Sequence, residues 1–346
     1  MFIRNAWYVA ATSAECTHRP LGRTMLNEKL VLFRTEDGIA SALEDRCCHR
    51  YAPLSFGDVE ATGIRCRYHG LVFNREGICV EIPGQTHIPP EHCVRSYPIE
   101  ERHGFVWVWM GDPKKADPGK IVDVHWNNKP GWPTASGYIH YKANYQLIAD
   151  NLLDFSHLTY VHRSTLANSE LPNTKTDIEA FEGGIRLNRA IRNCDPSPLH
   201  QAGGKFAGKV DFWTRQVWWL PSVFENWAGS AVASDASAPH ELEDGFHIRH
   251  FSLITPETDK TSHYFWINPT RFPDGDDTLI EMVQKGIETA FAEDLWIIEA
   301  QQAVIDQSDE FRPNGIVNDA ALSRIRAMTR KLLQQEAAEE SAMTQG

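Results

Sequence analysis

The first third of the chain, up to about residue 113, alternates short apolar runs with residues that favour turns. Two of these runs, at residues 30–34 and 105–110, are β-branched and aromatic and are bounded by turn signals. Seven glycines recur between positions 22 and 84 at spacings typical of turns. The pattern predicts a small all-β domain made of short strands.

The pattern changes after a connection rich in Pro, Gly, Lys and Asp at residues 111–119, which predicts a domain boundary. We therefore divide the chain into a domain of residues 1–115 and a domain of residues 116–346. Stretches 195–208 and 229–245, rich in Pro, Gly or small polar residues, are predicted to be loops. The second domain is predicted to be α+β, an antiparallel sheet packed against helices. Its strands are expected at 139–147, 176–193, 210–220, 246–255 and 262–268, and its helices at 147–161, 278–307 and 319–335, with a fraying tail from 336.

Composition narrows the range of partners. The 346 residues carry 34 basic and 46 acidic side chains, a net charge of −12. This charge argues against a nucleic-acid partner, because phosphate binding needs a basic face. The seven cysteines lack the spacing of a disulfide framework, which favours a reducing cytosol. With no signal-peptide core and no apolar run of about 18 residues, we expect a cytoplasmic protein that does not enter a membrane.

Two short mixed motifs predict a metal site divided between two loops. Cys47 and His49 form a C-x-H pair, and Cys66 and His69 form a C-x-x-H pair sixteen residues further on. A structural zinc site commonly groups its cysteines on one loop and its histidines on another. In a Rieske centre, two cysteines hold one iron of a [2Fe–2S] cluster and two histidines hold the other. A zinc site on the same four residues, and a chance match, are the alternatives.

At these four residues the chain resembles the Rieske proteins, and the resemblance implies one [2Fe–2S] cluster. The pairs Gly70-Leu71 and Pro83-Gly84 are similar to the turns that shield such a cluster. Cys48 departs from the family pattern, which usually has Pro there. Because it lies between two ligands, we expect its side chain to point away from the iron.

A second candidate metal site lies between residues 150 and 162. On a regular helix, Asp150, Asp154 and His157 would share one face. His157 and His162, five residues apart, would lie about 140° apart around that helix. For both to bind one metal, the helix must end, bend or bulge between them. By itself the His pair is weak evidence, and ordinary hydrogen bonding is the alternative.

A third ligand is expected from the helix predicted at 278–307. Asp294 falls in its apolar stripe with Ile287, Phe291 and Ile298, whereas Glu293 is expected to turn toward water. A surface carboxylate at the edge of the stripe is the alternative interpretation of Asp294. Two histidines and one carboxylate form the facial triad of non-haem Fe(II) oxygenases.

The two motifs together resemble the catalytic subunit of Rieske non-haem iron oxygenases over nearly the whole chain. The resemblance implies a helix-grip, START-like catalytic domain, with His157, His162 and Asp294 as ligands of a mononuclear Fe(II). It implies that Asp154 links an iron-ligating histidine to the Rieske centre of a neighbouring subunit, through His69, in a head-to-tail homotrimer. It also implies that Asn151 lies near the iron.

The resemblance further implies the reaction. The chain lacks a flavin motif, a nucleotide-binding loop and a plant-type ferredoxin cysteine run, so we expect NAD(P)H electrons to arrive from a separate reductase, with O₂ as co-substrate. The start at residues 5–11 and the segment 150–154 are similar to the subgroup of vanillate, dicamba and toluenesulfonate oxygenases. That subgroup implies oxygenation of a methyl or methoxy group on an aromatic acid or sulfonate.

Other functions stay open at this point. A ring-hydroxylating dioxygenase would use the same iron ligands to form a cis-diol on an aromatic carboxylate. A Rieske electron carrier, or a binder of hydrophobic ligands, would need no second metal. Arg249 and His250 are candidates for holding an anionic head group. An aromatic cluster could form the wall of a substrate slot or could simply be core: Trp213, Trp218, Trp219, Phe224 and Trp227.

Overall fold

The computed structural model describes residues 1–163, 165–166, 170–233, 245–273 and 276–344, and the chain divides into two compact units. The first unit comprises Met1–Ile121 together with Thr255–Asp259. The second comprises Val122–Ile254 and Lys260–Gly346. None of the described helices is long and apolar enough to cross a membrane.

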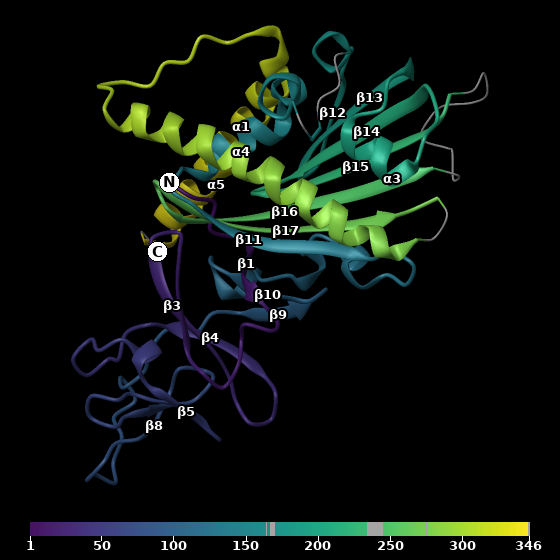
Figure 1. The fold of residues 1–346 in the computed structure, drawn as a ribbon. Helices are drawn as coiled ribbons and strands as arrows, with labels where there is room; N and C mark the ends of the chain where they lie inside the picture. The colour runs from purple at the N-terminus through teal and green to yellow at the C-terminus, as the bar shows by residue number, and fades with distance from the viewer. Residues whose placement is uncertain (164, 167–169, 234–244, 274–275, 345–346) are drawn as a thin grey trace. The chain divides into compact units, whose positions relative to one another are not determined.

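The first unit consists of three small antiparallel sheets (Figure 1). One sheet joins β1 (Trp7–Thr12), β10 (Phe105–Trp109) and β9 (Ile99–Arg102). The second joins β2 (Leu21–Met25), β3 (Glu28–Arg34) and β4 (Ala40–Glu44). The third joins β5 (Asp58–Glu60), β6 (Gly63–Arg65), β7 (Val72–Phe73) and β8 (Cys79–Glu81). Short 3₁₀ turns lie at Leu54–Phe56, Pro113–Lys115 and Pro118–Lys120.

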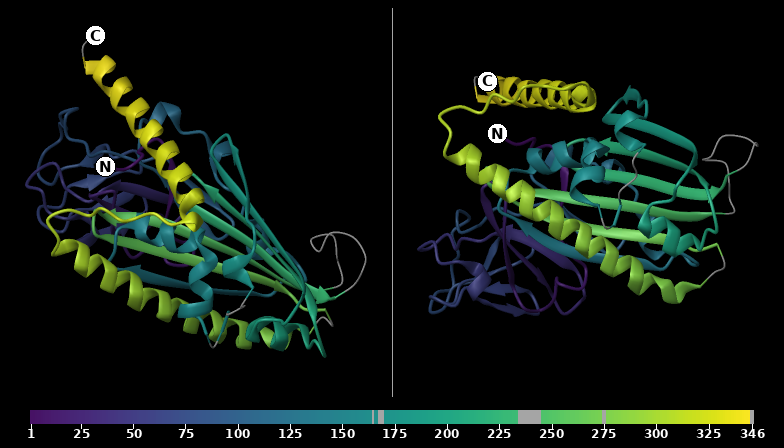
Figure 2. Two further views of the ribbon diagram at one scale, coloured as in Figure 1. Left: turned by 90° about the horizontal axis from the view of Figure 1, so that it is seen from above. Right: turned by 45° about the horizontal axis from the view of Figure 1, so that its top comes forward.

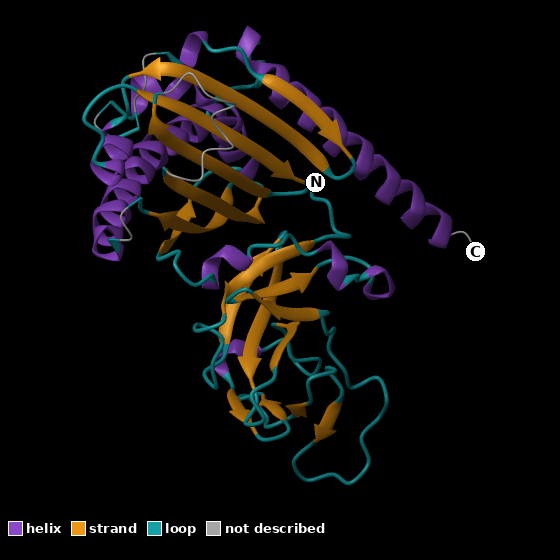
Figure 3. Cartoon of the chain, turned by 90° about the vertical axis from the view of Figure 1, so that its right-hand side faces the viewer, coloured by secondary structure: helices purple, strands orange, loops and turns teal. Residues whose placement is uncertain are grey.

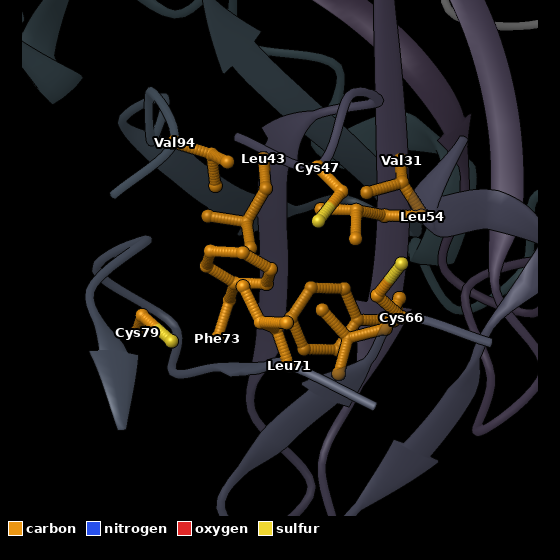
Figure 4. Packing of buried hydrophobic residues seen from close by; sticks show 11 residues of the cluster. Val31, Leu43, Cys47, Leu54, Cys66, Leu71, Phe73, Cys79 and Val94 are labelled. Carbon is orange, nitrogen blue, oxygen red and sulfur yellow. The ribbon is translucent and has the colours of Figure 1, made fainter. Parts of the chain in front are cut away.

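An apolar cluster fills the first unit between its second and third sheets. Figure 4 shows Phe73 and Leu71 from the third sheet region beside Val31 and Leu43 from the second. All of these side chains are almost completely buried. The short apolar runs seen in the sequence thus supply a core, and the two cysteine–histidine loops are anchored on it.

The second unit is organised by one seven-stranded antiparallel sheet (Figures 1 and 3). The strand order is β11-β17-β16-β15-β14-β13-β12. The interior strand β16 is buried on both faces, whereas the edge strand β12 is largely exposed. The bounds are β11 (Thr134–Tyr141), β12 (Asp177–Phe181), β13 (Gly184–Cys194), β14 (Val210–Trp219), β15 (Val223–Val232), β16 (Phe246–Thr258) and β17 (Thr261–Arg271).

The long helix α4 (Ile280–Asp306) crosses one face of this sheet (Figure 2). Its Phe291 ring lies 5.5 Å from that of Tyr264 and 5.3 Å from that of Trp266, so the apolar stripe of the helix packs on β17. We call this the inner face of the sheet. The other helices are α1 (Tyr145–Leu153), α2 (Leu158–Val161), α3 (Pro198–Gly204) and α5 (Ala320–Thr344); 3₁₀ turns lie at His125–Asn128, Phe155–His157, Leu171–Asn173, Asp277–Leu279 and Val317–Asp319.

Several predicted elements differ from the structure. The 195–208 stretch contains helix α3, which begins with a Ser197 cap and Pro198 in its first turn. Strand β15 was not predicted. It covers the start of the predicted 229–245 loop, of which residues 234–244 lie outside the described part. Its Gly229 is required by packing, because a Cβ there would lie 2.1 Å from the Trp213 ring. The predicted fraying from residue 336 is also wrong, since α5 continues to Thr344.

Candidate active site

The two cysteine–histidine loops of the first unit share one hydrogen-bond pattern. In each loop the cysteine N–H donates to the carbonyl five residues later, at 2.9 Å for Cys47 and 2.8 Å for Cys66. The cysteine carbonyl accepts from the N–H four residues later, at 2.9 Å in both loops. The residue at that fourth position has a positive φ, 60° at Tyr51 and 79° at Gly70. The loops are therefore built alike, although the histidine follows the cysteine by two residues in one and three in the other.

The four candidate cluster ligands separate by burial. The thiols of Cys47 and Cys66 are both buried in the apolar cluster (Figure 4). The rings of His49 and His69 are exposed and their centroids lie 4.5 Å apart. Two inner thiols facing two outer imidazoles fit a [2Fe–2S] cluster with one iron on each pair.

The surroundings of the loops agree with this arrangement. At Gly70 a Cβ would lie 2.8 Å from Cγ of Pro83, so the glycine allows both the positive φ and the close approach of the Pro83 turn. Cys48 packs against the apolar cluster of the unit. That it does not bind iron stays a prediction.

In the second unit the chain breaks its helix before His157 and ends the next helix at His162. Helix α1 ends at Leu153 because Asp154 leaves the helical region, with φ −116° and ψ 93°. The Asp154 side chain accepts from the Ser156 N–H at 2.9 Å and so begins a new turn. His162 ends helix α2 at φ −103° and ψ 44°. A continuous helix over 147–161 is therefore wrong. The helix end that two histidines on one metal require is found at His162, whereas the break at Asp154 lies before His157.

Three side chains converge at this break. His162 Nε2 lies 3.1 Å and His157 Nε2 lies 3.6 Å from the Asp294 Oδ1 atom. All three potential ligand atoms lie within 4.8 Å of one another. Asp294 is 6% exposed and His162 1% exposed, so water does not solvate this carboxylate freely. Asn151 donates from Nδ2 to Asp294 Oδ1 at 2.9 Å.

Hydrogen bonds at the outer nitrogens orient both rings. His157 Nδ1 donates to the backbone carbonyl of Asp154 at 2.5 Å, and His162 Nδ1 donates to Glu293 Oε2 at 2.9 Å. Each bond places the proton on Nδ1 and leaves Nε2 with a lone pair toward Asp294. The expectation that Glu293 turns toward water is therefore wrong, because its long side chain reaches back to His162.

Burial and charge act differently on the two imidazoles. Burial lowers the pKa of His157, with a smaller opposing effect of the Asp294 charge. For His162 burial also favours the neutral form, but Asp294 and Glu293 together outweigh it and raise the pKa. Two imidazoles and one buried carboxylate on one side of a cavity fit a mononuclear Fe(II), which such a triad leaves with open positions.

A cavity of about 110 Å³ opens beside this triad, between helices α1–α4 and the inner face of the sheet. Half of the side chains that line it are leucine, isoleucine or phenylalanine. Cavities of about 150 Å³ with such walls bind benzene, so this space has the scale of one aromatic ring. Among the described lining residues there is no lysine or arginine. The polar residues beyond the triad are Asn151, Ser197, His200, Asn226, His250 and Asn268.

The candidate substrate residues fall in different places. His250 lines the cavity, but Arg249 does not. The Arg249 guanidinium stacks on the rings of Trp126, at 3.8 Å, and Trp227, at 4.4 Å, and pairs with Glu225 at 3.1 Å. Residues 249 and 250 point to opposite faces of β16, because side chains alternate along a strand.

The residues of the aromatic cluster also lie in different places relative to the cavity. Phe224 lines the cavity. Trp219 lies outside it, with its ring 5.1 Å from that of Phe181. Trp213 and Trp218 are 2% and 1% exposed, as expected of core residues. The polar cavity residues Asn226 and Asn268 were not singled out in the sequence; their inward positions on alternating strands were the available signal.

Two family models match the chain. The Rieske [2Fe-2S] domain matches residues 6–98, and the vanillate O-demethylase oxygenase C-terminal domain matches residues 141–335. A putative toluene-4-sulfonate monooxygenase system iron-sulfur subunit of Comamonas testosteroni is 49% identical, covering 97% of this chain and 98% of the relative. The dicamba O-demethylase oxygenase component of Stenotrophomonas maltophilia is 36% identical, covering 97% and 99%.

Comparison with solved structures supports the same family. Dicamba monooxygenase bound to dicamba has a TM-score of 0.88 with 35% identity, covering 97% of this chain and 99% of that chain. A second crystal structure of that enzyme, with non-heme iron and dicamba, has a TM-score of 0.83 with 34% identity, covering 98% and 99%. The cluster loops and the His/Asp triad thus correspond to two known kinds of iron site. The chain belongs to the Rieske non-haem iron oxygenases with a vanillate O-demethylase type C-terminal domain, and it is an enzyme of that family.

Proposed function

We propose that this chain is the terminal oxygenase of a multicomponent system and inserts one oxygen atom from O₂ into a methyl or methoxy group of an aromatic acid or sulfonate. The observation that carries the proposal is the ring-sized apolar cavity that ends at His157, His162 and Asp294. The relatives named for toluene-4-sulfonate, vanillate and dicamba support the substrate class.

We assign the site residues as follows. Cys47, His49, Cys66 and His69 hold the [2Fe–2S] cluster, and His157, His162 and Asp294 hold the mononuclear iron. The cluster supplies single electrons, and the mononuclear iron, when bound, supplies the open positions at which O₂ is activated. The cavity walls position the substrate methyl group beside the triad and exclude water from it.

Residues near the iron support that chemistry. Asn151 fixes the Asp294 carboxylate through its Nδ2 hydrogen bond. Asp154 holds the His157 ring through its carbonyl, and its carboxylate shares a second cavity, of about 660 Å³, with His157. In our proposal this cavity receives the Rieske domain of the next subunit in a head-to-tail trimer, with His69 meeting Asp154.

The proposed hydroxylation requires an external electron donor. Hydroxylation of a methyl group consumes O₂, two electrons and two protons and yields an alcohol and water; a hydroxylated methoxy group then loses formaldehyde. We propose that a separate reductase transfers the electrons from NAD(P)H. We also propose that the boundary between the two domains lies near residue 115 of the chain and that the protein acts in the cytoplasm. Arg249 and Trp219 have no role in this proposal, because they lie outside the cavity lining.

Oxygen labelling tests the reaction. Turnover under ¹⁸O₂ with a surrogate reductase should place one labelled oxygen in the alcohol formed from toluene-4-sulfonate. With vanillate, the one labelled oxygen should leave in the formaldehyde. Incorporation of two labelled atoms as a ring cis-diol would favour the dioxygenase instead. Metal analysis should find three irons and two acid-labile sulfides per chain, and a count of two irons would favour an electron carrier.

A further inference from the structure

Asn268 on strand β17 lines the cavity and carries an unpaired donor. Its side chain is completely buried, at 0% exposure, and lines the cavity. Its Oδ1 is occupied, because it bonds to His250 Nδ1 at 3.1 Å. Its buried Nδ2 has no hydrogen-bond partner among the described residues. A buried donor without a partner destabilises the fold, so its presence at a cavity points to a ligand that accepts from it.

A chain of hydrogen bonds fixes the orientation of this amide. The Tyr264 hydroxyl lies 2.7 Å from Ser252 Oγ, which lies 2.6 Å from His250 Nε2. All of these groups are buried, and burial lowers the pKa of His250 to about 4, so its ring is neutral and carries one proton. The proton of each group must find an acceptor.

With Asn268 Oδ1 facing His250 Nδ1, one direction of this chain gives every hydroxyl and imidazole proton an acceptor. When Tyr264 donates to Ser252 and Ser252 donates to His250 Nε2, the His250 proton is on Nδ1 and is donated to Asn268 Oδ1. In the opposite direction the Tyr264 proton, at the end of the chain, would lack an acceptor. The chain therefore holds the Asn268 oxygen toward His250 and turns both amide hydrogens away from it.

The rest of the cavity lining determines what kind of acceptor fits. No lysine or arginine is among the described lining residues, and the Arg249 guanidinium is held by Glu225 and two tryptophans. A group that required an ion pair would find none from these side chains. Neutral N–H donors instead bind any strong oxygen acceptor, whether a sulfonate, a carboxylate or an uncharged sulfonyl group.

We propose that Asn268, oriented by the Tyr264–Ser252–His250 chain, is a specificity-determining residue that binds an acid oxygen of the substrate through its amide hydrogens. The inference deepens the proposed function and depends on it for the substrate class. His250 is then a positioning residue: it acts through Asn268, since both of its ring nitrogens are already bonded.

The test measures binding by calorimetry on the iron-loaded enzyme, with toluene-4-sulfonate, toluene-4-sulfonamide and toluene as probes. In the wild type, the uncharged sulfonamide should bind within about tenfold of the sulfonate, and toluene should bind about 10- to 100-fold more weakly. A sulfonamide as weak as toluene would overturn the proposal, because it would show that the site recognises charge.

Variants supply the second measurement. Asn268→Ala should weaken the sulfonate about 10- to 100-fold and leave toluene unchanged, and Asn268→Asp should weaken it further by repulsion. Gln284→Ala is the matched control: this carboxamide bonds to Ser136 on the β11 edge, outside the cavity, and should change neither probe. Equal losses for toluene and the sulfonate, or no loss for the sulfonate, would overturn the role of Asn268.

These measurements separate the two proposals. A wild type that binds the probes as expected but oxidises none of them would contradict the proposed function alone. Normal turnover that is insensitive to Asn268→Ala would contradict this inference alone.

Discussion

The two iron sites of this chain are built in different ways. The four cluster ligands lie between residues 47 and 69, on two loops that repeat one hydrogen-bond pattern around Cys47 and Cys66. The mononuclear site joins two histidines at a helix break to Asp294, which follows more than 130 residues later on α4. One site is defined locally, whereas the other exists only when α1, α2 and α4 pack together.

The two sites also differ in the exposure of their proposed ligands to solvent. The cluster histidines are exposed, so electrons can enter and leave through rings at the surface. The mononuclear ligands His162 and Asp294 are buried beside an apolar cavity, where a substrate can displace water from the iron. Each arrangement suits its chemistry, because the first site exchanges electrons with partners and the second keeps a reactive centre dry.

The largest effect should come from Cys66→Ala. Loss of one thiolate leaves one cluster iron with an incomplete ligand set, so the cluster and all activity should be lost. Because the triad is built independently, the mononuclear iron should remain. Metal and sulfide analysis should find one iron and no labile sulfide per chain.

Cys48→Ala is the control for that variant. Cys48 packs on the apolar cluster and should not bind iron, so three irons and the visible absorption should be kept. Loss of the cluster in the control, or its retention in Cys66→Ala, would contradict the ligand assignment.

A second test concerns the link between the sites. Asp154→Asn keeps an oxygen that can accept from the Ser156 N–H and the carbonyl that holds His157, and removes only the negative charge. We expect all three irons to be retained and turnover to fall about 100-fold. Rapid mixing of the reduced enzyme with O₂ should show slow oxidation of the cluster. Near-normal coupled turnover would refute the proposed relay.

The same comparison explains what the sequence could predict. Cys47, His49, Cys66 and His69 could be proposed as cluster ligands because their spacing is short and specific. The apolar stripe on α4 placed Asp294 correctly among buried residues. The angle between His157 and His162 predicted that the helix does not continue regularly through His162, which is where α2 ends; the break at Asp154 was not predicted. These inferences depend on local geometry.

What the sequence could not predict depends on long-range packing. Strand β15 contains small residues that become a strand because β14 and β16 pair with it on both sides and because Gly229 accommodates the Trp213 ring. Glu293 was placed toward water because helical periodicity ignores the reach of a long side chain. Arg249 and His250 were equivalent in sequence until the sheet placed them on opposite faces.

The third prediction concerns the outer ligand shell of the buried site. Glu293→Ala should weaken iron binding about 10- to 100-fold, because the His162 ring loses the acceptor that fixes its proton on Nδ1. Glu293→Gln, which can still accept at Oε1, should recover part of the affinity. Competition with a chelator would measure the dissociation constant of the mononuclear iron, and the cluster absorption should stay unchanged.

Glu281→Gln is the matched control for these variants, since Glu281 is an exposed glutamate at the start of the same helix. It should leave iron affinity unchanged. Equal losses in the Glu281 and Glu293 variants would show that the effect is one of helix charge and not of the bond to His162.

The smallest effect should be a difference in pH dependence between the two units. Asp150 of α1 pairs with Arg326 of α5, and burial, only partly offset by that arginine, raises the pKa of Asp150 to about 6. The unfolded value is about 3.9, so the folded state binds this proton more tightly and its contribution to stability is lost as the pH rises through 6. Lowering the pH from 7 to 5 should therefore increase the free energy of unfolding of the second unit by about 1 kcal/mol from this group.

Asp150→Asn removes this titration while keeping the shape of the side chain, so the difference between wild type and variant isolates it from all other groups. Denaturant unfolding followed by far-ultraviolet circular dichroism at pH 5 and pH 7 should show the difference. Bleaching of the cluster absorption, which reports the first unit, should have the same midpoint in both proteins at each pH. A shift of the bleaching midpoint alone would mean that Asp150 stabilises the first unit, which carries the cluster. A residue of α1 in the second unit would then control the cluster loops, and this would contradict the separation of the two sites.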